Sequence, residues 1–153
     1  MEFTVIHADQ THTEAIARFN QAMALETESK QLDSDTIMNG VDTMVRDAAL
    51  GFYLVAVADD TTVGCLGVTY EWSDWRNGLF WWVQSVYVEP RARGQGIFSA
   101  MYEQVKQLAS QDARVCGIRL YVEKDNQRAT RTYEKLGMTE TEYRIMEEEF
   151  ARS

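Results

Sequence analysis

Two arginines and two glycines lie close together in the middle of the chain, directly after its only proline. They are Arg91, Arg93, Gly94 and Gly96. Apolar residues before the proline predict the end of a buried strand, and the pattern from Ile97 onward predicts a helix. A glycine-rich turn leading into a helix presents unpaired backbone N–H groups beside the positive end of the helix dipole. The stretch therefore predicts a site for phosphate oxygens.

The same turn fits neither of two common nucleotide-binding patterns. A dinucleotide-binding turn needs a third glycine where this chain has Ser99, and it follows a parallel strand-helix-strand start, whereas antiparallel strands are predicted here. A P-loop needs Gly-Lys followed by serine or threonine, which the chain lacks. Both patterns can be set aside.

The rest of the chain predicts the elements that position this turn. We expect a strand over 3–7, helices over 13–24 and 34–48, strands over 52–58, 63–72 and 79–88, a helix over 97–108, a strand over 118–123, a helix over 126–136 and a last antiparallel strand in the tail 138–150. Asp33 or Ser34 is expected to cap the second helix, and Gly51 and Gly137 to end helices. This order predicts a mixed α+β sheet with helices on its faces.

Composition narrows the class of protein. A chain of 153 residues fits a single domain, 1–153, with a real core. With 24 acidic and 15 basic residues the formal charge is −9, which argues against a nucleic-acid partner. No apolar run approaches membrane-spanning length and no leader is evident, so the cytoplasm is the default location and no membrane partner is expected.

The two cysteines, Cys65 and Cys116, match no metal-ligand spacing. Both occur in apolar, strand-like contexts, which predicts reduced core thiols. No metal site is expected.

The glycine turn resembles the coenzyme A site of the GCN5-related N-acetyltransferase (GNAT) superfamily. The signature of that family, Q/R-x-x-G-x-G/A at the start of the central helix, is matched by Arg91, Gly94 and Gly96. A second segment, 120–138, resembles the later strand-helix element of the family. Its matching residues are Asn126, Ala129, Tyr133, Gly137 and Met138. The resemblance covers about 63–138 and implies a single-domain acyl-CoA N-acyltransferase fold with a central, mostly antiparallel twisted sheet.

The resemblance assigns the donor site residue by residue, with acetyl-CoA as cosubstrate. Backbone amides from Arg93 to Phe98 would hold the pyrophosphate, and the arginines would add positive charge. Val86 and Val88 would pair with the pantetheine arm as with an added strand, and the amide of Val86 would face the thioester oxygen. The cofactor-binding residues expected in this way are Val86, Val88, Arg91, Arg93, Gly94, Gln95, Gly96, Ile97, Phe98 and Asn126.

Two residues of the second segment each have a structural alternative. Tyr133 resembles the tyrosine that protonates the departing thiolate in many members, and phenol and thiol reference pKa values of about 10 and 8.5 make that transfer plausible. Its alternative is an amphipathic core residue. Asn126 resembles a coenzyme-contacting asparagine, and its alternative is a helix N-cap.

The sequence departs from the family where a general base is expected. Several members carry a glutamate on the strand before the glycine turn, at positions that align with Trp82 or Gln84. Neither side chain can accept a proton from an amine. The remaining candidates are Glu71, Asp74, or a water relay through residues 85–87 (Ser85 and Tyr87), with Glu71 first.

All four tryptophans fall within 70–82. Trp81 and Trp82 are adjacent, so one is expected in the core and the other at a surface. Trp72 and Trp75 are expected to wall a substrate pocket beside acidic residues, which would suit a cationic amine, or to pack in a dimer.

The resemblance implies an N-acetyltransferase that acts on a primary amine of a small molecule or peptide by direct attack. The alternative is a non-catalytic acyl-CoA-binding regulatory module with the same fold. Oligomeric state follows only from the family's tendency toward homodimers.

Overall fold

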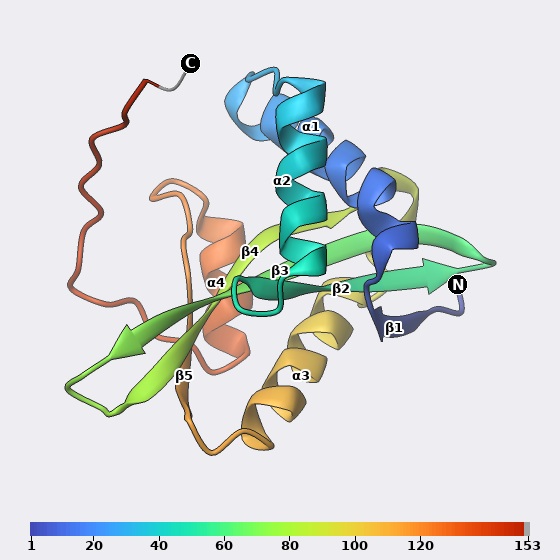
Figure 1. The fold of residues 1–153 in the computed structure, drawn as a ribbon. Helices are drawn as coiled ribbons and strands as arrows, with labels where there is room; N and C mark the ends of the chain where they lie inside the picture. Colours follow the sequence, from blue (N-terminus) through green and yellow to red (C-terminus); the bar gives the residue numbers. More distant parts are fainter. Residues whose placement is uncertain (152–153) are drawn as a thin grey trace. The chain divides into compact units, whose positions relative to one another are not determined.

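The computed structural model describes residues 1–151 and divides the chain into two compact units. The first unit is Met1–Tyr121, and the second begins at Val122. The first unit contains the sheet and three helices, α1 to α3 (Figure 1). Each unit is described below by itself.

The sheet of the first unit has five strands. They are β1 (Thr4–His7), β2 (Gly51–Ala58), β3 (Thr61–Ser73), β4 (Gly78–Val88) and β5 (Val115–Leu120). Their order in the sheet is their order in the chain. Neighbours from β1 to β4 are antiparallel, whereas β5 is parallel to β4. The predicted α+β class with a mostly antiparallel sheet is confirmed, with one parallel pair at its edge.

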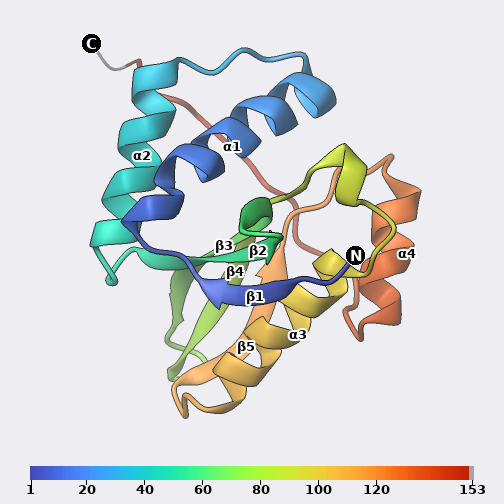
Figure 2. The ribbon, with the colours of Figure 1, turned by 90° about the vertical axis from the view of Figure 1, so that its right-hand side faces the viewer.

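Helices cover both faces of this sheet, as Figure 2 shows. On one face lie α1 (Thr13–Glu28) and α2 (Ser34–Arg46). The core between these helices and the sheet comprises Ile16, Ala17, Phe19, Val41, Tyr53, Val55, Cys65 and Tyr87. Phe19 stacks on Tyr87 with ring centroids 5.5 Å apart, so burial of apolar surface holds α1 against the end of β4.

The other face is covered by α3 (Ile97–Ser110). Its residues Ile97, Met101 and Val105 recur one helical turn apart and are buried. Because Ile97 is the first residue of the helix, this burial fixes the N-terminal end of α3, and with it the glycine turn.

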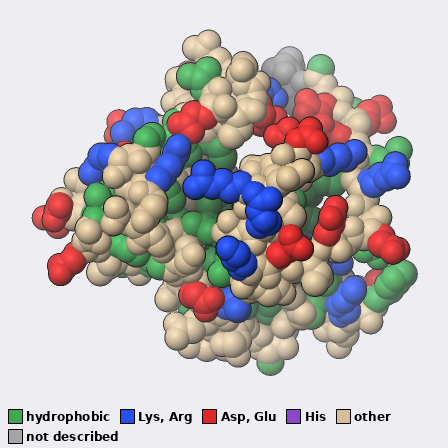
Figure 3. Space-filling view, turned by 180° about the vertical axis from the view of Figure 1, so that it is seen from behind, with side chains coloured by type: hydrophobic (Ala, Val, Ile, Leu, Met, Phe, Trp, Pro, Cys, Tyr) green, Lys and Arg blue, Asp and Glu red, His purple; other side chains and the backbone are tan. Residues whose placement is uncertain are grey.

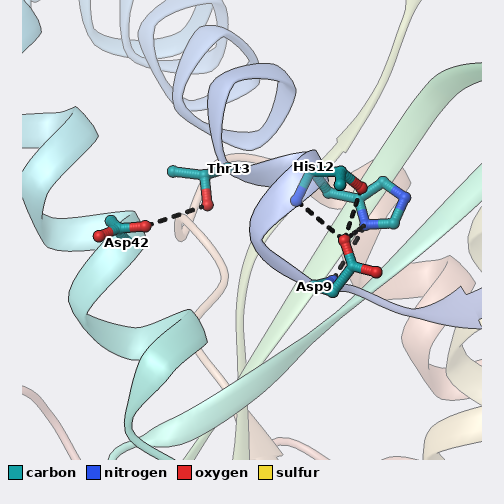
Figure 4. A network of polar contacts seen from close by, with 5 residues as sticks. Asp9, His12, Thr13 and Asp42 are labelled. Atoms are coloured by element: carbon teal, nitrogen blue, oxygen red, sulfur yellow. Dashed lines mark hydrogen bonds and ion pairs between the residues drawn. The ribbon is translucent and has the colours of Figure 1, made fainter.

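Local hydrogen bonds fix the short 3-10 turn Gln10–His12 that leads into α1, as Figure 4 shows. The backbone N–H of Asp9 donates to Nδ1 of His12 across 3.0 Å, and the Asp9 carboxylate accepts from the N–H of Thr11. These reciprocal bonds form a capping box. Thr13 donates to Asp42 across 3.5 Å and connects α1 to α2. His12 therefore has a structural function.

The second helix ends earlier than predicted. It stops at Arg46, because Asp47 is extended with φ −123° and ψ 97°. Gly51 is the first residue of β2 and does not end a helix. The predicted cap Asp33 is confirmed, since its carboxylate accepts from the N–H of Thr36.

The last strand of the first unit begins at Val115 and ends at Leu120, earlier at both ends than predicted. Gly117 suggested a strand start, but it lies inside the strand. A Cβ at Gly117 would lie 2.6 Å from the ring of Phe80, so the glycine makes room for that ring.

Both cysteines were predicted to lie in the core, and the structure confirms this for one of them. Cys65 is buried, and burial raises the pKa of its thiol to about 12. Cys116 is exposed, because it lies on β5, the edge strand of the sheet. Among residues 1–151, no three His, Cys, Asp or Glu side chains are grouped as metal ligands.

The second unit contains α4 (Gln127–Lys135). Gly137 ends this helix with φ 101°, as predicted. The predicted last strand is wrong for the described part of the tail, since residues 139–151 contain no helix or strand. The alternation of Tyr143 and Ile145 with charged residues suggested a strand. The side chains of Tyr143 and Ile145 are exposed, however, and three consecutive glutamates follow them.

No helix in the described chain combines the length and the apolar content needed to cross a bilayer.

Candidate active site

The glycine turn has the backbone conformation that its residues predict. Gly94 and Gly96 have φ of 78° and 79°, in the left-handed region that a residue with a Cβ adopts only with strain. At both glycines no atom beyond the chain neighbours lies within 4 Å of the position that a Cβ would take. Backbone conformation, and not crowding, therefore requires glycine here, and the adjoining space is open to a ligand.

Gly96 is also the N-cap residue of α3, and no side chain caps this helix. The N–H groups of such an end lie beside the positive pole of the helix dipole. The first turn of α3 can therefore bind phosphate oxygens.

β4 extends beyond its pairing with β5. The last paired residues are Val83 and Leu120, whereas β4 continues to Val88. A β-bulge follows the last pair, since Ser85 has φ 53° and the register with β3 shifts there. After the bulge, Tyr87 and Val88 are paired with β3, and no residue of β4 from Gln84 to Val88 is paired with β5. An extended amide-bearing ligand can pair with such an edge.

Both arginines of the turn are paired with carboxylates of this chain. Arg91 donates from Nε to Glu89 across 2.9 Å. Arg93 donates from Nε to the carbonyl oxygen of Val88 across 2.9 Å and from Nη2 to Glu26 across 3.0 Å. These guanidinium groups fix the loop to β4 and to α1, and the open anion site is formed by backbone groups.

Glu26, near the end of α1, connects this helix to the loop of the glycine turn through Arg93. Its carboxylate also accepts a hydrogen bond from the hydroxyl of Tyr87 across 2.8 Å. The Tyr87 hydroxyl, and after it the Arg93 guanidinium, lower the pKa of Glu26 below its ordinary value of 4.5. Burial and the neighbouring carboxylate raise the pKa of Tyr87.

The second unit contains the other two predicted site residues. Asn126 is the N-cap of α4, and its side-chain oxygen accepts from the N–H of Ala129 across 3.1 Å. The structural alternative for Asn126 is therefore present, and its contact with a coenzyme stays a prediction. Tyr133 lies on α4 and is half-buried, and burial raises the pKa of its phenol. The phenol therefore keeps its proton at neutral pH, as a general acid must.

Glu71 lies far along the sheet from the predicted thioester position. It is paired with Phe80, near the start of β4. At about 3.3 Å per residue, the stretch of β4 from Phe80 to Val86 is roughly 20 Å long. The structure does not bring Glu71 and Val86 together, and a function of Glu71 as the base does not fit a thioester at Val86. Asp74 lies still farther away, in the turn after β3.

Glu71 instead takes part in a polar cluster on the sheet. Its Oε1 accepts from the indole N–H of Trp82 across 2.8 Å and from Arg119 across 3.1 Å. The Arg119 guanidinium also lies 3.6 Å from the ring centroid of Phe80. The cluster joins β3, β4 and β5, so Glu71 has a structural function that the sequence did not indicate.

The tryptophans divide between core and surface. Trp81 is buried and Trp82 is half-buried against Tyr121, as expected for adjacent strand residues. Trp72 and Trp75 are exposed at the far end of the β3–β4 hairpin, Trp75 by 85%. Their predicted place beside the acyl-transfer site does not fit this position.

A cavity of about 440 Å³, widely open to the surface, lies between α1 and the end of β4. Its lining residues are Arg18, Phe19, Ala22, Tyr87, Glu89, Pro90 and Arg91. The lining thus combines apolar side chains with two guanidinium groups and one carboxylate. Sequence reasoning did not identify Arg18 or Glu26, because a single charged residue on an amphipathic helix has no distinguishing pattern.

Comparison with known proteins supplies the family. The model of the acetyltransferase (GNAT) family matches residues 13–138, and the chain therefore belongs to this family. The match extends over parts of both compact units. No curated protein is similar enough in sequence to match the chain.

Solved structures agree with this assignment. A protein from Clostridium difficile 630 described as a possible acetyltransferase is 41% identical, with a TM-score of 0.91, covering 99% of this chain and 100% of the other. A predicted acetyltransferase from Clostridium acetobutylicum, solved with acetyl-CoA, is 15% identical, with a TM-score of 0.79 and 96% of each chain covered. A transcriptional regulator from Bacillus halodurans C-125 is 20% identical, with a TM-score of 0.81, covering 97% of this chain and 100% of the other. The last two similarities show the fold alone.

Proposed function

We propose that the protein transfers an acetyl group from acetyl-CoA to a primary amine of a small molecule or peptide. The observation that carries this proposal is the geometry around the end of β4. There a strand edge not paired with β5 leads into two left-handed glycines and a helix without a side-chain cap. Membership of the GNAT family supports the same reading.

In this proposal the chain binds the donor mainly with its backbone. The amides of residues 93–98 hold the pyrophosphate, and Val86 and Val88 pair with the pantetheine amides. Arg93 acts indirectly, because its guanidinium is held by Glu26 and by the Val88 carbonyl. It keeps the loop in the shape that binds phosphate.

The chemical step is a direct attack by the amine nitrogen on the thioester carbonyl carbon. A C–N bond forms, the C–S bond breaks, and the nitrogen loses one proton. The amide of Val86 stabilises the negative oxygen of the tetrahedral intermediate. Tyr133 gives its phenolic proton to the departing thiolate and then regains a proton from solvent. Burial raises the pKa of the phenol, which is therefore protonated before the transfer.

The amine proton needs a path, since a primary alkyl amine with a pKa of about 10.4 is mostly protonated at neutral pH. Because Glu71 lies on β3 opposite Phe80, near the start of β4, the water relay through Ser85 and Tyr87 becomes the first candidate. The Tyr87 hydroxyl donates to Glu26 and so can accept a hydrogen bond from water. In the relay the proton therefore passes from water through the Tyr87 hydroxyl toward Glu26.

Thiol release from acetyl-CoA in the presence of an amine panel tests the proposal. We expect turnover that depends on both acetyl-CoA and an amine, with N-acetylated product seen by mass spectrometry. Binding of acetyl-CoA without turnover of any amine would favour the non-catalytic coenzyme-binding module. Absence of acetyl-CoA binding would contradict both readings.

A further inference from the structure

The cavity between α1 and the end of β4 is the feature that says most about the acceptor. Its wall is formed by Phe19, Ala22, Tyr87 and Pro90, which give it an apolar surface. Tyr87 lines the cavity. The residue before it in the chain is Val86, whose amide is proposed to face the thioester oxygen. A ligand in the cavity therefore lies next to the end of β4 where acyl transfer is proposed.

The charges of the residues that line the cavity do not cancel. Arg91 is paired with Glu89, and the two charges compensate each other. Arg18 has no carboxylate partner among the described residues and lies 5.8 Å from the ring centroid of Phe19. The cavity therefore carries one uncompensated positive charge. Although the whole chain is acidic, basic side chains also gather beside hydrophobic surface on the face seen in Figure 3.

The cavity and the phosphate site share the loop after β4, but the strand residues beside them, Tyr87 and Val88, point to different faces of the sheet. Tyr87 belongs to the core beneath α1 and α2. Val88 points to the opposite face, because its side chain and that of Ile97 both approach the Cβ position of Gly64. The N-terminus of α3 lies on that second face. A donor bound along α3 would thus leave the cavity on the α1 side to the acceptor.

We propose that this cavity binds the acceptor, and that the acceptor is a small primary amine carrying a carboxylate and an apolar group, of which an apolar α-amino acid is the simplest example. Arg18 forms the ion pair with the carboxylate, and the apolar wall contacts the side chain. This inference rests on the proposed function. It replaces the expectation of a purely cationic amine, which depended on acidic residues that lie at the other end of the hairpin.

The test compares phenylalanine with phenylalaninamide, which differ at the carboxylate. Binding of each to the full-length protein saturated with coenzyme A is measured by calorimetry, and thiol release is measured with acetyl-CoA. The same measurements are made on Arg18→Gln, on Arg18→Lys, which keeps the charge, and on Arg46→Gln. Arg46 is a matched control on α2, paired with Asp42.

We expect the wild-type protein and Arg46→Gln to bind phenylalanine about 10-fold more tightly than the amide, which is the ratio for one charge-assisted hydrogen bond. Arg18→Gln should bring the ratio to about one, and Arg18→Lys should keep part of it. Comparing this ratio between variants cancels the other differences between the two ligands, which are the same for every variant. The affinity for coenzyme A should not change in any variant.

Two results would overturn the inference. One is an equal or weaker binding of phenylalanine relative to its amide in the wild-type protein. The other is a loss of coenzyme A affinity in Arg18→Gln, which would assign the arginine to a phosphate of the donor. Carboxylate-dependent binding without thiol release, from phenylalanine or from any amine of the panel, would support this inference and contradict the proposed function, so the two can fail separately.

Discussion

The guanidinium of Arg93 donates a hydrogen bond from Nη2 to Oε2 of Glu26, and the two atoms are 3.0 Å apart. The pair joins the loop of the glycine turn to α1. The same carboxylate accepts from Tyr87, which lies on the strand between them. Helix α1, strand β4 and the loop of the glycine turn are therefore held together by one glutamate.

Glu26→Gln should loosen this connection, raise the KM for acetyl-CoA and lower the Tm. Because hydrogen bonds from Tyr87 and Arg93 lower the pKa of Glu26, its stabilising effect is present above pH 4.5 and is lost as the pH falls through the lowered value. The Tm difference between wild type and variant should therefore be largest near neutral pH and vanish in acid. A difference that stays constant with pH would contradict the assignment.

Tyr133→Phe should lower kcat about 10²-fold or more, the effect expected for loss of a general acid. Its affinity for acetyl-CoA should change little. Steady-state kinetics and a binding titration separate the two effects, with Tyr143→Phe in the exposed tail as the control. An unchanged kcat would return Tyr133 to a packing function.

Gly96→Ala should destabilise the protein by about 1–2 kcal/mol, because a residue with a Cβ is strained at φ 79°. The variant should also bind acetyl-CoA more weakly. Gly40→Ala provides a matched comparison, since Gly40 lies within α2 with no atom near its Cβ position. Alanine there should stabilise by about 0.5–1 kcal/mol. Thermal unfolding of both variants would show shifts of opposite sign, and shifts of the same sign would argue against this account.

Glu71→Gln should leave the pH profile of kcat unchanged, because the residue lies roughly 20 Å along the strand from Val86. It should lower the Tm slightly through loss of the ion pair with Arg119, which is partly exposed and therefore weak. The pH-rate profile of the variant decides the matter. A displaced acidic limb would restore Glu71 as the general base.

Much of the fold follows from local pattern. Alternating apolar residues predicted the two outer strands of the sheet, β1 and β5, and continuous apolar runs bounded by turn residues predicted the three strands between them. The conformation of the turn at Gly94 and Gly96 was also predictable, because positive φ values are adopted without strain mainly by glycine. Boundaries were less accurate where a glycine had a tertiary reason, as Gly117 has beneath Phe80.

The surroundings of the cavity between α1 and the end of β4 were not predictable in the same way. The bulge at Ser85 requires a positive φ at a residue with no preference for it, so it depends on the sheet around it. Glu26 and Arg18 are ordinary charged residues in the sequence of α1, and only the packing of this helix on β4 gives them neighbours. The distance of Glu71 from the end of β4 was not predictable either, because strand order alone does not give the distance along a strand.

The central claim is that acetyl-CoA binds along the end of β4 and the N-terminus of α3. Amide chemical shifts of the 15N-labelled protein, followed as acetyl-CoA is added, test this directly. We predict that the largest changes fall on Val86, Val88 and residues 93–98, and that Gly96→Ala weakens them. Saturable changes confined to other residues, with these amides unmoved, would contradict the account.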